Sequence, residues 1–203
     1  MEGKLPWIFG IGSPKSGSNS LADALKIMGF NAKHTFQDLF DGNNSVLKLL
    51  ESYKEGDLPS ELAGVDALVD WPMQRMWPAL MRRYPEAKFI LTYRTPDEVA
   101  LSWCRQMLAQ PEVAKSQPIK EYSRFKRDVE EHVNRVLKAF LNEGDRLLIL
   151  NASDSDSTKW KLLSVFLGME VDHGRPYPRS FDHAKWQSSK EELDQMKGCN
   201  PER

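Results

Sequence analysis

Near the N-terminus, residues 7–20 have the sequence Trp7-Ile8-Phe9-Gly10-Ile11-Gly12-Ser13-Pro14-Lys15-Ser16-Gly17-Ser18-Asn19-Ser20. The apolar run at residues 7–11 predicts a buried first strand. Apolar residues then recur at helical spacing from residue 18 to residue 28, and Gly29 stands where such a helix would end. We therefore expect a strand, a glycine- and serine-rich turn, and a helix in direct succession.

The remainder of the chain continues this alternation without an internal repeat. Strands are predicted at residues 31–34, 67–70, 88–93 and 146–150, and helices at residues 73–84, 119–142 and 158–167. A further helix should begin at Thr95-Pro96-Asp97-Glu98, with the threonine as cap. The polar residues 37–61 should cover a sheet edge as helix and loop. This pattern predicts an α/β fold of three layers, P-loop-like, with a mostly parallel sheet and helices on both faces.

Length and composition bound the class of protein. The 203 residues suit a single domain, 1–203, in which we expect the tail at residues 171–203 to be irregular. A formal net charge of −1 argues against a nucleic-acid partner or a surface for anionic membranes. We expect no membrane insertion, because no run of about 18 apolar residues occurs. The two cysteines, Cys104 and Cys199, suggest no disulfide framework, which favours a reducing, cytoplasmic location. Oligomeric state is left open.

The turn after the first strand is a predicted anion cradle. Its glycines let backbone N–H groups converge, the following helix adds unpaired amides, and Lys15 adds a full charge. Gly12 and Gly17 have the spacing of a Walker P-loop, but Ser18 and Asn19 follow where that motif has Lys and Ser or Thr. The lysine lies inside the loop instead.

Three blocks resemble the sulfotransferases that use 3′-phosphoadenosine-5′-phosphosulfate (PAPS). Residues 14–18 resemble their 5′-phosphosulfate loop, and residues 84–96 resemble the strand that leads to their 3′-phosphate site. Arg94 and Ser102 reproduce the eight-residue interval of that site. The segment 160–168 resembles a late helix beside the nucleotide. The short length and Asp70-Trp71-Pro72 are more similar to a compact, broadly distributed branch of the family.

The resemblance implies which residues bind the donor and which act on the acceptor. It assigns the nucleotide to Pro14, Lys15, Ser16, Gly17, Ser18, Asn19, Ser20, Arg94 and Ser102, to which the tail could add Arg179. It implies sulfuryl transfer to a hydroxyl or amine of a small acceptor, with 3′-phosphoadenosine-5′-phosphate (PAP) as product and no metal. Lys15 would contact the bridging oxygen. His34 resembles the family's base, and Asp70 is its rival; His132, in the long helix, is expected in solvent.

Two departures from the family keep other interpretations open. Asn19 stands where the family has Ser or Thr, and the tail offers only Arg175 and Arg179 in place of an Arg-Lys-Gly loop. Trp160 and Phe181 are candidates to contact adenine, although core packing would explain Trp160 equally well. The alternatives are a P-loop nucleotide kinase, with residues 68–70 as a Walker-B-like strand, and an inactive nucleotide-binding module on the same scaffold.

Overall fold

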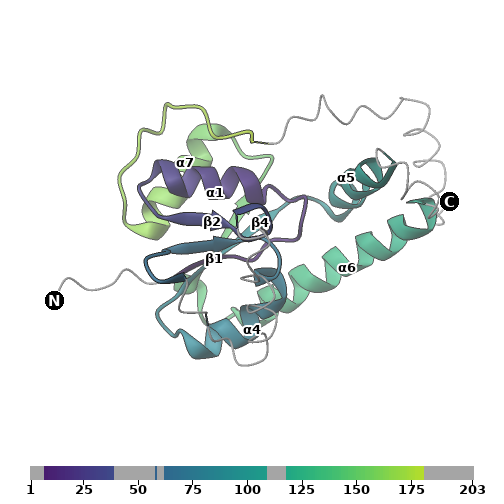
Figure 1. Ribbon diagram of the computed structural model, residues 1–203, viewed down its shortest axis with the longest axis horizontal. Helices are drawn as coiled ribbons and strands as arrows, with labels where there is room; N and C mark the ends of the chain where they lie inside the picture. Colours follow the sequence, from purple (N-terminus) through teal and green to yellow (C-terminus); the bar gives the residue numbers. More distant parts are fainter. Residues whose placement is uncertain (1–6, 39–57, 59–61, 109–117, 181–203) are drawn as a thin grey trace.

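The structure is a computed structural model that describes residues 7–38, 58, 62–108 and 118–180 (Figure 1). In this part of the chain, five strands form one sheet in the order β2-β3-β1-β4-β5, and every neighbouring pair is parallel. The strands are β1 (Ile8–Gly10), β2 (Ala32–His34), β3 (Ala67–Val69), β4 (Lys88–Tyr93) and β5 (Leu147–Asn151). The predicted parallel sheet is therefore confirmed, with β1 at its centre.

Helices cover both faces of this sheet, as the sequence predicts. They are α1 (Ser18–Ile27), α2 (Thr35–Asp38), α4 (Met73–Arg83), α5 (Pro96–Leu108), α6 (Pro118–Ala139) and α7 (Asp156–Leu167), with a short 3-10 helix η3 at Gly144–Arg146. Figure 1 shows α1 and α7 on one face and α4 on the other. Helices α5 and α6 pack against each other, with the rings of Trp103 and Phe125 stacked at 5.4 Å.

Each face of the sheet has its own apolar core. Ile8 packs with Leu21 and Leu25 of α1 and with Trp160 of α7, whereas Phe9 belongs to the opposite core under α4 and α6. Successive residues of a strand point to opposite faces, so a strand covered on both sides is apolar throughout. This explains the continuous apolar run at the start of the chain. Trp160 is fully buried, so core packing accounts for it.

Local signals in the sequence predict the ends of most helices and strands to within one to three residues of those in the structure. The strand at residues 88–93 and the helix start at Thr95 are confirmed: the Glu98 N–H donates to Thr95 Oγ1 at 3.3 Å, and the Thr95 N–H donates to Glu98 Oε2 at 3.0 Å. This is a reciprocal capping box. Helix α7 begins at Asp156, earlier than predicted, because Ser155 caps it by accepting from the Thr158 N–H.

One expectation about the long helix is wrong. His132 is only 9% exposed, and its Nε2 lies 2.7 Å from the carbonyl oxygen of Ile11. The physical reason is its place on α6, where Val129, His132, Val136 and Phe140 form the stripe that faces the core. His132 therefore holds the end of β1, directly before the predicted anion cradle.

Some predictions fall outside the described residues. Most of the segment 37–61 lies there, as do Cys199, Phe181 and the rest of residues 181–203. The described part of the tail, residues 171–180, has neither helix nor strand. Of the helices in the described ranges, none has both the length and the apolar character needed to cross a bilayer.

Candidate active site

The cradle loop connects the central strand β1 to helix α1. Gly17 precedes the helix with φ of 113° and no side chain to cap it, and the first intrahelical bond runs from the Leu21 N–H to the Gly17 carbonyl. The amides of the first helical turn therefore lack intrahelical acceptors. Together with the positive end of the helix dipole, they form a site for an anionic group.

The loop is held closely against the end of β4. The hydroxyls of Ser16 and Thr92 lie 2.7 Å apart, and Ser16 Oγ also donates to the Ser13 carbonyl at 2.5 Å. A Cβ on Gly12 would lie 2.0 Å from Thr92 Oγ1, so this position has no room for a side chain. The first glycine of the motif thus serves the close approach of loop and strand.

Lys15 and Asp70 are the only non-glycine residues in the described ranges with positive φ, at 72° and 82°. Backbone strain of this kind concentrates at functional sites. Burial lowers the pKa of the Lys15 ammonium, Asp70 opposes this shift, and the charge of Arg94 adds to it. The lysine therefore lies within electrostatic reach of both Asp70 and Arg94.

His34 and Asp70 form a buried pair at the ends of two adjacent strands. His34 is the register partner of Val69, and Asp70 follows Val69 directly. His34 Nε2 lies 3.3 Å from Asp70 Oδ2 and 3.2 Å from Ser18 Oγ. Burial lowers the pKa of the His34 imidazole and raises the pKa of the Asp70 carboxyl, while their mutual attraction opposes both shifts. The two rival bases are thus one coupled unit.

A cavity of about 590 Å³ opens beside the loop on the β4–β5 side. Its walls come from Ser16, Gly17 and Ser20, from Thr92 and Arg94, from residues 150–157 with Lys159, and from residues 177–179. The residues between β5 and α7 were not among the predicted site residues. Because β5 is the parallel neighbour of β4, its carboxyl end meets the same edge of the sheet, which is the signal that could have found them.

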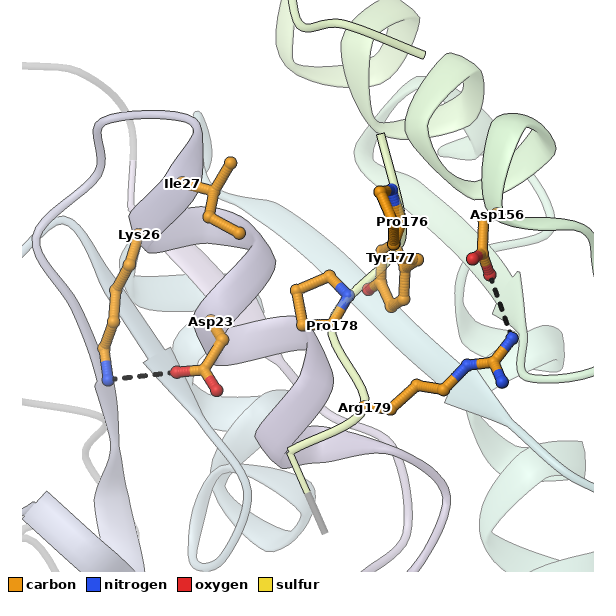
Figure 2. Close-up of a pocket in the computed structure, with 8 residues that line it drawn as sticks. All are labelled: Asp23, Lys26, Ile27, Asp156, Pro176, Tyr177, Pro178 and Arg179. Atoms are coloured by element: carbon orange, nitrogen blue, oxygen red, sulfur yellow. Dashed lines mark hydrogen bonds and ion pairs between the residues drawn. The ribbon is translucent and has the colours of Figure 1, made fainter. Parts of the chain in front are cut away.

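A larger, shallower hollow of about 850 Å³ lies on the other side of the tail, above α1 (Figure 2). It shares Asp156 and residues 177–179 with the first cavity, but it includes no residue of the cradle loop. Figure 2 shows Arg179 extended toward Asp156, with 3.7 Å between Nη2 and Oδ1. Of these two hollows, only the smaller cavity is lined by both the loop and Arg94.

A sulfotransferase domain model matches residues 7–127, which is more than half of the chain. The chain belongs to the sulfotransferase family. The match includes the cradle loop, both members of the His34–Asp70 pair, Arg94 and Ser102, whereas β5, α7 and the tail lie beyond it. No curated protein matches the chain. Family membership indicates sulfuryl transfer as the general activity and leaves the donor and acceptor to be argued from the site.

Half of the ten residues that the sequence assigns to the nucleotide line the smaller cavity. They are Ser16, Gly17, Ser20, Arg94 and Arg179. The Arg179 side chain is 85% exposed and lies 3.7 Å from Asp156, so its contact with the nucleotide stays a prediction. Lys15 lies within the same loop and interacts with the charge of Arg94.

Other predicted ligands do not reach this cavity. Ser102, 8% exposed on α5, is not part of the lining, so its contact with the nucleotide stays a prediction. Pro14, Ser18 and Asn19 also lie outside the lining, although all three belong to the loop or its helix. Asn19 Oδ1 is buried without a hydrogen-bond partner in the described residues.

Metal-ligating residues do not gather in this sulfotransferase site. In the described ranges, no three side chains among His, Cys, Asp and Glu are placed to hold a metal ion. The charged side chains that line the smaller cavity are those of Arg94, Lys159 and Arg179, together with Asp154 and Asp156.

Proposed function

We propose that the protein transfers a sulfuryl group from PAPS to a hydroxyl or amine of a small acceptor, without a metal, and releases PAP. The observation that carries this proposal is the joint placement of the Lys15 loop and Arg94 around one cavity. It gives two cationic sites, one for each phosphorylated end of the donor. The cavity volume is within the range that suits small-molecule ligands.

Each end of the donor suits the residues nearest to it. The uncapped amides of the first turn of α1 and the Lys15 ammonium suit the 5′-phosphosulfate, because both favour concentrated negative charge. The Arg94 guanidinium, after β4, offers two parallel donors, which suits a terminal phosphate. AMP lacks the 3′-phosphate, and ATP carries its extra phosphates on the 5′ side, so neither nucleotide would offer a 3′-phosphate to Arg94.

The transfer breaks the bond between sulfur and the bridging oxygen of the donor and forms a bond between sulfur and the acceptor atom. The bridging oxygen leaves with the electron pair as part of PAP, and negative charge grows on it. Lys15 would stabilise that charge in the transition state, where stabilisation raises the rate. Positioning and charge neutralisation are the main contributions in a loose transfer of this kind.

The acceptor also loses a proton, which the His34–Asp70 pair would take. His34 Nε2 lies within 3.3 Å of both Ser18 Oγ and Asp70 Oδ2, so a proton taken up by the imidazole would be stabilised by the carboxylate. Burial shifts the two pKa values toward each other, which makes the pair a better base than an ordinary aspartate. The pair, and not either residue alone, is the proposed general base.

A turnover assay with PAPS and a panel of alcohols, phenols and amines tests this function. We expect acceptor-dependent release of PAP that persists in excess EDTA. Tight PAP binding without transfer to any acceptor would favour the inactive binding module. Magnesium-dependent binding of ATP, equal in strength to that of PAP, would favour the kinase.

The role of Arg94 has its own binding test with a matched control. Arg94→Ala should weaken PAP binding by about 2–4 kcal/mol in calorimetry, because a 3′-phosphate would lose its charged partner. AMP binding should change little. Arg82→Ala removes an exposed arginine of α4 and should change neither PAP binding nor AMP binding. An equal loss of PAP and AMP binding would make Arg94 a structural residue.

A further inference from the structure

Lys159 is a buried cation that makes no ion pair within the described residues, although the charges of Asp154 and Asp156 act on it from beyond ion-pair distance. It is 9% exposed and lines the smaller cavity. Its Nζ lies 5.2 Å from the centre of the Tyr177 ring, and no carboxylate of the described residues lies within ion-pair distance of it.

The position of Lys159 on its helix makes this arrangement unfavourable for stability. It lies in the first turn and a half of α7, where the helix dipole favours acids over bases. Burial lowers the pKa of the Lys159 ammonium, which shows that the surroundings disfavour its charge. The nearest acid along the helix, Asp156, lies 3.7 Å from Arg179 of the tail (Figure 2). A structural salt bridge therefore does not explain the lysine.

Arg94 lines the same cavity as Lys159. Asp156 and Asp154 oppose the effect of burial on the pKa of the Lys159 ammonium, whereas the charges of Arg179 and Arg94 lower this pKa further. Lys159 and Arg94 are therefore within electrostatic reach of each other. Two like charges beside one cavity repel each other unless an anion separates them. A phosphate monoester, with a charge of about −1.5 to −2, is an anion of the right strength.

We infer that Lys159 and Arg94 together hold the 3′-phosphate of the nucleotide, so that Lys159 determines specificity for PAPS over nucleotides without that group. This inference rests on the proposed function. Sheet order indicates which phosphate is meant: β5, which leads into α7, is the neighbour of β4 and not of β1, so Lys159 follows the strand beside the one that ends at Arg94. The 5′ group belongs to the loop, and the 3′ group to Arg94 and Lys159.

Calorimetry with PAP and AMP tests the inference on Lys159→Met, which keeps the length of the stem and removes the charge. The matched control is Lys161→Met, two residues along the same helix and exposed. We expect Lys159→Met to lose roughly 10- to 100-fold in PAP affinity, because a charged hydrogen bond is removed. AMP affinity should change less than about threefold, Lys161→Met should bind like the wild type, and Lys159→Arg should recover most of the loss.

The possible failures are distinguishable. If the wild type binds PAP no better than AMP, both the proposed donor and this inference are wrong. If the wild type prefers PAP and Lys159→Met keeps that preference, only the inference is wrong. An equal loss of PAP and AMP affinity would also overturn it, because Lys159 would then support the adenosine site or the fold. If Lys159→Met does not fold, Lys159→Gln is tested instead, by the same ratio of PAP affinity to AMP affinity.

Discussion

Replacing Gly12 by alanine should disrupt the loop that carries Lys15. The new methyl group would lie 2.0 Å from Thr92 Oγ1, 2.6 Å from the Thr92 carbonyl oxygen and 2.7 Å from Ser16 Oγ. Forcing a methyl into a packed site costs about 1–3 kcal/mol, and breaking the buried Ser16–Thr92 hydrogen bond costs about 1–3 kcal/mol more. We therefore expect a loss of about 2–6 kcal/mol in the free energy of unfolding, together with weaker PAP binding.

Urea unfolding of a small set of variants measures this loss. Gly144→Ala is the matched control, because nothing lies within 4 Å of the added methyl, and it should change stability by less than about 1 kcal/mol. Adding Thr92→Ala to Gly12→Ala removes the 2.0 Å contact but leaves the carbonyl at 2.6 Å, so part of the loss should return. Strictly additive losses, or a Gly12 variant as stable as the Gly144 variant, would refute the steric argument.

Three further predictions concern the loop, the base and the helix that supports them. Lys15→Met should lower kcat by roughly 100- to 1000-fold and weaken PAP binding much less, because the amides remain; equal losses in both would contradict a transition-state role. The rate should fall with decreasing pH as the His34–Asp70 pair takes up a proton. Because burial lowers the pKa of His34 and raises that of Asp70, the midpoint in a kcat/KM profile should lie below that of an ordinary imidazole and above that of an ordinary aspartate, and a midpoint above that of an ordinary imidazole would exclude the pair. His132→Ala should lower the free energy of unfolding by about 1–3 kcal/mol, because the Ile11 carbonyl loses its donor, whereas the exposed Asn134→Ala should not.

The parts of the fold that the sequence predicts well depend on short-range patterns. The strand at residues 88–93 has a continuous apolar run because it is buried on both faces. The helix after it begins at Thr95, where the cap and Glu98 stand at the spacing of a capping box. The cradle loop could be predicted for the same reason, because its glycines and its lysine are neighbours in the chain.

The parts that the sequence does not predict depend on contacts between distant segments. His34 and Asp70 meet because β2 pairs with β3 in one particular register, which neither strand specifies alone. Lys159 follows an ordinary helix start, and only the position of β5 beside β4 brings it to the cavity. The burial of His132 could have been predicted from the sequence, because Val129 and Val136 lie three and four residues away on the same buried stripe.

The order of the strands suggests why the two strained residues stand where they do. Because β1 is central, the loop after it has β3 and β2 on one side and β4 and β5 on the other. The first side carries the His34–Asp70 pair, and the second carries Arg94. Lys15 is affected by both: Asp70 raises the pKa of its ammonium and Arg94 lowers it. A sulfuryl group transferred in line from a nucleotide on the Arg94 side to an acceptor on the His34–Asp70 side would pass Lys15. The left-handed backbone at Lys15 and at Asp70 would then hold both charges along the line of transfer.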